Sequence, residues 1–213
     1  MHTIEVGRAA WKETAKETGD HSVRSWGPDS FLKDVLEKLM DEERLPRRGV
    51  AVDFGCGSGR DLVYMASVLQ EWQVVGLDNH SYALDRAAKL AEREGVSDRV
   101  KVDVVDLRKK GCLRNLRADL AYGCRFLHRP LLNEIRDSVL IGRKDATVIW
   151  STFLCGDENL APPYKKGRCL EHGELRDLFE PAGYKVIRDT EHPLPTRGVF
   201  VPASLFAAQY RSS

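Results

Sequence analysis

Short apolar runs alternate along the chain with segments whose apolar side chains recur every three or four residues. The runs are typical of buried strands, and the periodic segments are typical of amphipathic helices. Expected strands cover residues 49–54, 73–78, 99–105, 118–123, 146–153, 184–189 and 199–209. Expected helices cover about 30–42, 64–69, 83–91, 130–140 and 172–180. This alternation predicts an α/β fold with a doubly wound, seven-stranded sheet, right-handed crossovers and helices on both faces.

Several boundaries are marked by residues that begin or end regular structure. Asp29 and Ser30 are suitable N-caps for the first helix, and Gly95 closes the third. Pro181 ends the last helix. Pro202 lies inside the final apolar run, where its missing N–H limits the strand to a sheet edge, a bulge or a later start.

The totals are those of an ordinary globular chain. Of the 213 residues, 42% are hydrophobic and 31% are charged, which argues against a disordered or fibrous protein. The net charge of +1 predicts no general attraction to nucleic acid or to an anionic membrane. The opening segment is polar and no apolar run approaches the ~20 residues of a membrane span, so we expect a cytoplasmic protein.

Five cysteines lie at positions 56, 112, 124, 155 and 169. Their number is odd, and none of their spacings is C-x-x-C. This pattern predicts reduced thiols, with neither a disulfide framework nor a zinc site.

Three glycines follow the first strand in a G-x-G-x-G spacing, at positions 55, 57 and 59. Glycines at such a turn let bare main chain approach a ligand, which here could be a nucleoside. In the NAD fingerprint the third glycine would occupy position 60, which is Arg60. That departure disfavours a dehydrogenase, although a purely structural turn stays open on the glycines alone.

Aspartates stand at the ends of the first three strands. Asp53 precedes the glycine turn, Asp78 closes the second strand and Asp106 follows the third. A carboxylate in the position of Asp78 can accept from both ribose hydroxyls, and one at Asp106 can accept from an adenine amino group. Together these strand ends predict one nucleoside site, at the edge where the carboxyl ends of parallel strands meet.

With these residues the chain resembles the class I S-adenosylmethionine-dependent methyltransferases, which have a seven-stranded Rossmann-like sheet. The resemblance rests on A-V-D-F-G-C-G-S-G-R-D at 51–61, V-V-G-L-D-N at 74–79 and V-V-D-L at 104–107. It implies S-adenosylmethionine as cofactor. The implied cofactor-binding residues are Asp53, Gly55, Cys56, Gly57, Gly59, Arg60, Asp61, Asp78, Asn79, Asp106, Leu107 and Cys124. Cys124 is interpreted as a small buried residue beside the sulfonium, and not as a nucleophile.

A narrower resemblance is to the tellurite-resistance group of methyltransferases and their relatives that methylate small molecules. It rests on Trp26-Gly27-Pro28, Gly59-Arg60-Asp61, residues 126–130 and residues 173–176. Members of that group methylate small chalcogen or thiol-type acceptors. The segment ahead of Trp26 and the loop 154–170 do not match, so the resemblance does not identify the acceptor.

We expect a single domain in which residues 46–213 form the S-adenosylmethionine-binding methyltransferase core. Residues 1–45 precede the first strand, so they are expected to form a lid and a helix packed on that core. Trp11 and Trp26 are the candidate lid residues.

The acceptor is expected near the fourth strand, because the resemblance places the sulfonium there. Methyl transfer is an in-line displacement that chiefly needs alignment and exclusion of water. A thiolate or an oxyanion of selenium or tellurium needs a positive pocket more than a base. We therefore select Arg125 and His128 as the catalytic candidates. Other cations that can fold over the same edge are Arg129, His172, His192 and Arg197.

The leading hypothesis is a small-molecule methyltransferase, a monomer or homodimer without metal. The alternatives are a methyltransferase acting on protein or RNA, and a regulator that binds the cofactor without catalysis. The basic run from Arg108 to Arg117 could touch RNA phosphates, but with no interleaved aromatics it favours a solvated loop.

Overall fold

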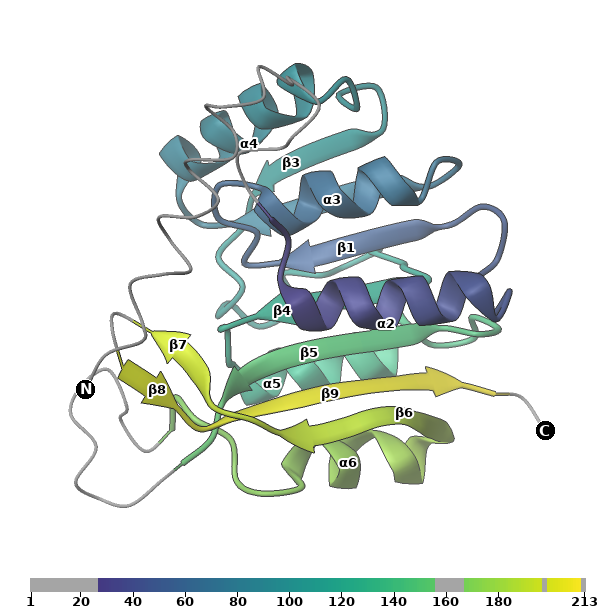
Figure 1. Ribbon diagram of the computed structural model, residues 1–213, viewed down its shortest axis with the longest axis vertical. Helices are drawn as coiled ribbons and strands as arrows, with labels where there is room; N and C mark the ends of the chain where they lie inside the picture. Colours follow the sequence, from purple (N-terminus) through teal and green to yellow (C-terminus); the bar gives the residue numbers. More distant parts are fainter. Residues whose placement is uncertain (1–26, 156–166, 197–198, 212–213) are drawn as a thin grey trace, which may run out of the picture.

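The computed structural model describes residues 27–155, 167–196 and 199–211 (Figure 1). The strands are β1 (Val50–Phe54), β2 (Gln73–Asp78), β3 (Val100–Val104), β4 (Leu120–Cys124), β5 (Thr147–Phe153), β6 (Tyr184–Glu191), β7 (Leu194–Thr196), β8 (Val199–Val201) and β9 (Ala203–Tyr210). The helices are α2 (Ser30–Asp41), α3 (Arg60–Val68), α4 (Ser81–Arg93), α5 (Arg129–Glu134) and α6 (Glu174–Phe179), with a π-helix η1 (Ile135–Val139) and a 3₁₀-helix η2 (Glu180–Ala182).

Seven strands form one sheet in the order β3-β2-β1-β4-β5-β9-β6, which confirms the predicted fold class. β1 pairs in parallel with β2 on one side and with β4 on the other. The chain order therefore reverses between β1 and β4. In open α/β sheets a ligand crevice forms beyond the carboxyl ends of the strands at such a reversal.

Helices cover both faces of the sheet, with α2, α3 and α4 on one face and α5 and α6 on the other (Figure 1). Each face has its own apolar core. The first core includes Leu36 of α2 and Met65 of α3, and the second includes Leu132 of α5 and Phe179 of α6. Within the described ranges, no helix combines the length and the apolar character needed to cross a membrane.

The final apolar run divides at Pro202 into two strands. β8 pairs with β7 in a separate two-stranded sheet, and β9 enters the main sheet antiparallel to both β5 and β6. Of the three options that Pro202 left open, the later start is the one observed, because Pro202 has no N–H for a ladder and lies between the two strands.

The predicted helix 130–140 is not uniform. It begins as α5 and continues as η1, where the Leu140 N–H donates to the Ile135 carbonyl at 3.0 Å, five residues back. The apolar periodicity of this segment does not distinguish a π turn from an α turn. The predicted helix 172–180 starts later, at Glu174, and its end tightens into η2 around Pro181.

The prediction of five reduced thiols is wrong for two of them, since Cys155 and Cys169 form a disulfide with Cα atoms 5.0 Å apart. Backbone pairing brings them together: Leu154 and Leu170 form a parallel bridge, and the Cys155 N–H donates to the Leu170 carbonyl at 2.8 Å. Sequence spacing could not reveal this pairing, because it depends on how the chain returns to the end of β5. Cys56, Cys112 and Cys124 are free thiols.

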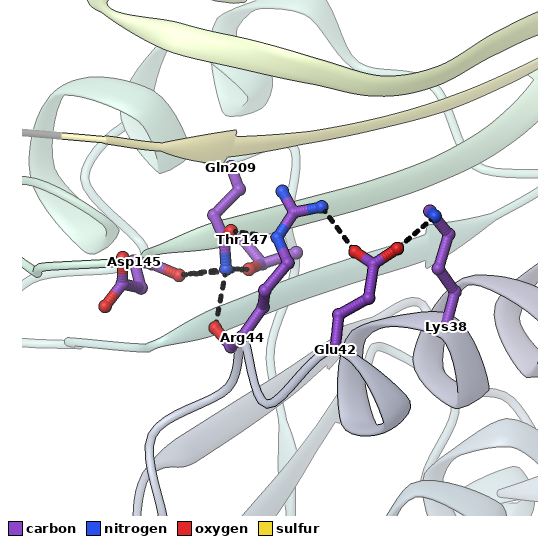
Figure 2. Close-up of polar contacts among 6 residues, drawn as sticks. All are labelled: Lys38, Glu42, Arg44, Asp145, Thr147 and Gln209. Atoms are coloured by element: carbon purple, nitrogen blue, oxygen red, sulfur yellow. Dashed lines mark hydrogen bonds and ion pairs between the residues drawn. The ribbon is translucent and has the colours of Figure 1, made fainter.

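The buried Gln209 of β9 ties three segments together at the amino end of β5 (Figure 2). Its amide nitrogen donates to the Arg44 carbonyl at 2.9 Å, the Asp145 carbonyl at 3.2 Å and the Thr147 hydroxyl at 3.2 Å. Its amide oxygen accepts from Arg44 Nε at 3.1 Å. The segment that follows α2 is thereby anchored to the sheet, while the first residues of α2 lie at the opposite, carboxyl edge.

Candidate functional site

A cavity of about 250 Å³ opens at the carboxyl ends of β1, β2, β3 and β4, where the reversal of strand order predicts one. It is lined by Gly55, Asp78, Asn79, His80, Val105, Asp106, Leu107, Arg108, Cys124, Arg125 and Phe126. Seven of these were predicted site residues: Gly55, Asp78, Asn79, Asp106, Leu107, Cys124 and Arg125.

The glycine turn requires glycine at all three positions. Gly55, Gly57 and Gly59 have φ angles of 81°, 53° and 81°, in the left-handed region that side chains disfavour. A Cβ at Gly59 would lie 2.6 Å from Ala87 Cβ, so this glycine lets α3 and α4 approach closely. A Cβ at Gly57 would meet nothing within 4 Å, so the space above this residue is open to a ligand.

Asp78 connects the end of β2 to the glycine turn. Its Oδ2 accepts from the Gly57 N–H at 2.9 Å, and its Oδ1 accepts from the His80 N–H at 2.9 Å. Each oxygen of a carboxylate has a second acceptor position, so the oriented group keeps the capacity to accept two hydroxyl donors. Asp106 is oriented similarly, by the Arg108 N–H at 3.1 Å. These acceptors fit the sugar and base of a nucleoside.

The buried carboxylate of Asp61 accepts four hydrogen bonds from protein groups. It accepts from the Asp29 N–H at 2.7 Å, from Arg60 Nε at 2.9 Å and Nη2 at 2.7 Å, and from the Tyr122 hydroxyl at 2.9 Å. All four donors are on the protein. Asp61 therefore holds together the start of α2, the start of α3 and the end of β4.

Asp53 is buried with 3% of its surface exposed. Burial raises the pKa of its carboxyl well above the usual range, and the negative charges of Asp61 and Asp78 raise it further, whereas Arg60 opposes them. Neither Asp53 nor Cys56 lines the cavity. The Cys56 sulfur packs against Gly76 of β2, where an added Cβ would lie 2.8 Å from it.

The start of α2 reaches the same edge of the sheet. Asp29 caps the helix, with Oδ1 accepting from the Leu32 N–H at 3.2 Å. Its Oδ2 lies 3.7 Å from the Sγ of Cys124, one of the residues that line the cavity. Burial, and secondarily the charge of Asp61, raises the pKa of Asp29 above its usual value, although the Leu32 N–H opposes this.

The Cys124 thiol stays neutral at ordinary pH. Burial raises its pKa to about 11, with a further contribution from the charge of Asp29. A thiol nucleophile needs the opposite shift, since the thiolate is the reactive form. The environment of Cys124 therefore agrees with its interpretation as a small wall residue.

The two catalytic candidates, Arg125 and His128, differ in their position relative to the cavity. Arg125 is exposed at the cavity and has a φ of 55°, an uncommon conformation for a non-glycine residue. Its N–H donates to the Ser151 carbonyl at 2.7 Å, which fixes the bend after β4. His128 begins α5 outside the cavity lining, and its Nδ1 is buried without a hydrogen bond to any described residue. The structure thus brings Arg125, and not His128, to the cavity wall.

The other candidate cations have structural partners or lie elsewhere. Arg129 forms an ion pair with Glu174 and donates through Nη2 to the Cys169 carbonyl at 2.9 Å. His172 lies 2.7 Å from a Glu191 carboxylate oxygen. The His192 side chain is exposed. Trp11, Trp26 and Arg197 fall outside the described residues, so the expected lid does too.

Five residues of this region were missed as site residues by sequence reasoning. His80, Val105, Arg108 and Phe126 line the cavity. Val105 is the last residue of the predicted third strand, and each of the other three directly follows a predicted site residue. Their positions after the strands were a usable signal. Asp29 was interpreted only as a helix cap, and nothing in the sequence connects it with Cys124, 95 residues away.

Residues 51–138, from β1 into η1, match the family described as the methyltransferase domain. A search of curated proteins found no match. Among solved structures, TehB from Haemophilus influenzae superposes with a TM-score of 0.67 at 12% identity, over 92% of this chain and 65% of TehB. This chain therefore spans less than two thirds of TehB.

A methyltransferase dependent on S-adenosylmethionine from Methanosarcina mazei superposes with a TM-score of 0.60 at 17% identity, covering 82% of this chain and 98% of that protein. The cyclase SpnF superposes with a TM-score of 0.62 at 16% identity, covering 84% and 81%. At such identities these likenesses show the fold alone. The family match covers residues 51–138, less than half of the chain.

Proposed function

We propose that this chain is a class I S-adenosylmethionine-dependent methyltransferase that methylates a small anionic acceptor, such as a thiolate or a chalcogen oxyanion; the match of residues 51–138 to the methyltransferase domain supports the activity. The observation that carries the acceptor class is the exposed guanidinium of Arg125 at the cavity wall, directly after Cys124. A cation beside the transfer position would attract and orient a negatively charged nucleophile. The narrower sequence resemblance supports the same class.

The cofactor, when bound, supplies a methyl group on a positively charged sulfur. Three observations support this cofactor: Asp78 could offer acceptors to a ribose, Asp106 and Leu107 line the same cavity and could contact an adenine, and the space above Gly57 is open. Arg125 would hold the acceptor anion in line with the methyl group. The acceptor's lone pair forms the new bond to carbon, and the electron pair of the broken carbon–sulfur bond remains on sulfur.

No base is required for such an acceptor, since it already carries the reacting lone pair. His128 would then act by orienting the acceptor or the Arg125 loop, three residues away. The Trp150 indole N–H donates to the Phe126 carbonyl at 3.0 Å and holds this loop in place. This contact would help to keep the backbone after β4 in the position that alignment demands.

The test is a methyl-transfer assay with labelled S-adenosylmethionine and a panel of thiols, selenite, tellurite, phenols, peptides and RNA. We expect transfer to thiols or chalcogen oxyanions, and a fall of about 10-fold or more in kcat/KM for Arg125→Ala, as for a lost charge-assisted contact. Arg93→Ala, an exposed arginine at the end of α4, is the matched control.

Transfer to RNA or peptides alone would overturn the acceptor class and favour the macromolecular alternative. Tight binding of the cofactor without transfer to any acceptor in the panel would favour the regulator. SpnF shows that a chain with this fold can be a cyclase, so transfer has to be measured and not assumed from the fold.

The remaining expectations belong to the same proposal. We expect a monomer or homodimer in the cytoplasm, without nucleic acid or membrane partners. Residues 1–45 would form a lid and helix on the core 46–213, and α2 is the described part of that segment.

A further inference from the structure

Negative charge exceeds positive charge where α2 meets the ends of β1 and β4. The carboxyl groups of Asp29, Asp53 and Asp61 share one guanidinium, that of Arg60, which is already bound to Asp61 through two hydrogen bonds. The raised pKa values of Asp29 and Asp53 reflect burial first and this crowding second. The region would be stabilised by a further cation.

Only one of these carboxyl groups has an oxygen left for a ligand beside the cavity. Asp61 is used by four protein donors, and Asp53 lies beneath the turn. Asp29 uses Oδ1 for the helix cap, while its Oδ2 meets only the weak donor Sγ of Cys124 among the described residues. Asp29 is therefore the available acceptor at the Cys124 end of the cavity.

A second observation indicates that this spot receives a polar group. Ser151 pairs with Cys124 in the register of β4 and β5 and is fully buried. Apart from its contact with the weakly polar Cys124 thiol, its hydroxyl has no hydrogen-bond partner among the described residues. Buried hydroxyls ordinarily have a strong partner, so one that meets only a thiol beside the cavity wall is consistent with a bound polar ligand or water.

The ends of the cavity differ in chemistry. The strand order β3-β2-β1-β4 puts Asp106 and Asp78 towards one end of the cavity, where adenosine would bind, and Gly55 and Cys124 towards the other. S-adenosylmethionine and S-adenosylhomocysteine both carry an amino acid group, with an ammonium and a carboxylate, beyond the sulfur. We propose that Asp29 binds the ammonium of this methionine portion, so that α2 completes a cofactor site otherwise built from the sheet.

The hydrogen bonds of Asp29 would position its carboxylate for binding an ammonium. Its N–H is fixed by Asp61 and its Oδ1 by the first turn of α2, so Oδ2 is positioned before the ligand arrives. A positioned carboxylate loses little entropy on binding, and its contact with an ammonium is charge-assisted. Helix capping alone would leave the charge of Asp29 without a function, because Asn caps equally well.

Calorimetric titration of Asp29→Asn tests the proposal, because Asn keeps the cap and removes the charge. The probes are S-adenosylhomocysteine, its desamino analogue and 5′-methylthioadenosine, which lacks the amino acid portion. We expect Asp29→Asn to weaken S-adenosylhomocysteine by about 10-fold or more, as for a lost charge-assisted bond. The other two probes should bind as they do to the parent protein.

Asp41→Asn is the matched control, since Asp41 is the exposed last residue of the same helix. It should leave the affinity for all three probes unchanged. The proposal is overturned if S-adenosylhomocysteine binds Asp29→Asn as tightly as the parent, or if all three probes weaken equally. Circular dichroism and thermal unfolding of each variant establish whether α2 is intact.

Discussion

The Gly57 N–H donates to Asp78 Oδ2 at 2.9 Å, so the turn after β1 and the end of β2 orient each other. The carboxylate proposed to bind the ribose is thus also part of the glycine turn. Two features that lie 21 residues apart in the sequence form one structural unit.

Replacing Asp78 with Ala should therefore damage binding more than the loss of one ligand contact would suggest. We expect affinity for S-adenosylhomocysteine to fall by about 30-fold or more, because a charged acceptor is lost and the Gly57 N–H loses its partner. Calorimetry checks this. Asp85→Ala, an exposed position on α4, is the control. An unchanged affinity for Asp78→Ala would remove Asp78 from the site.

Gly59→Ala should destabilise the fold. The new Cβ would lie 2.6 Å from Ala87 Cβ and 2.9 Å from its Cα, at a φ of 81°. Overpacking of this kind costs about 1–3 kcal/mol, and the left-handed conformation adds about 1 kcal/mol. Urea unfolding measures the loss.

Gly57→Ala separates the two costs, because its Cβ meets nothing within 4 Å and only the conformational strain of about 1 kcal/mol remains. Equal losses of stability in the two variants would show that packing of α3 on α4 at Gly59 is not tight. Ala87→Gly combined with Gly59→Ala should recover part of the stability.

Asp53→Asn should stabilise the protein without cofactor at neutral pH. The pKa of Asp53 is higher in the folded protein than in the unfolded chain. The protonated carboxyl therefore favours folding at low pH, and this stabilisation is lost as the pH rises from the unfolded pKa towards the folded pKa. Each unit of such a shift corresponds to about 1.4 kcal/mol. The gain from Asn should therefore grow as pH rises from about 4, the unfolded pKa of Asp, towards neutrality.

Urea unfolding at a series of pH values checks this prediction, with Asp85→Asn as an exposed control. The Leu62 N–H, which donates to the Asp53 carboxylate, can donate to the Asn oxygen as well. A variant less stable than the parent at every pH would show that the Asp53 charge is compensated in the fold.

Because Cys155 and Cys169 form a disulfide, the number of titratable thiols should differ before and after reduction. Titration of the unfolded, unreduced protein should find the three free thiols of Cys56, Cys112 and Cys124, and titration after reduction should find five. Replacing both Cys155 and Cys169 with Ser should cost about 3 kcal/mol, as is typical of loops of this length. Five reactive thiols before reduction would contradict the disulfide.

The sequence alone determined the order of the elements and the strand-end residues. Apolar runs and helical periodicity were sufficient for α2, β1 to β5 and β6. In each of these elements the buried side chains recur at the spacing of the helix or strand, so the pattern is visible in the sequence. Gly55, Asp78 and Asp106 were found because parallel strands end at one edge, and that rule needs only the order of elements. Asn79 and Leu107 came from the resemblance to the methyltransferase family.

What the tertiary structure alone decided are the relationships between segments far apart in the chain. Pro202 marked a break, but only sheet pairing placed β9 between β5 and β6. The disulfide, the Gln209 anchor and the contact of Asp29 with Cys124 each depend on backbone pairing or on how α2 packs. Such contacts leave no periodic signal in the sequence, because they arise from where whole elements come to lie.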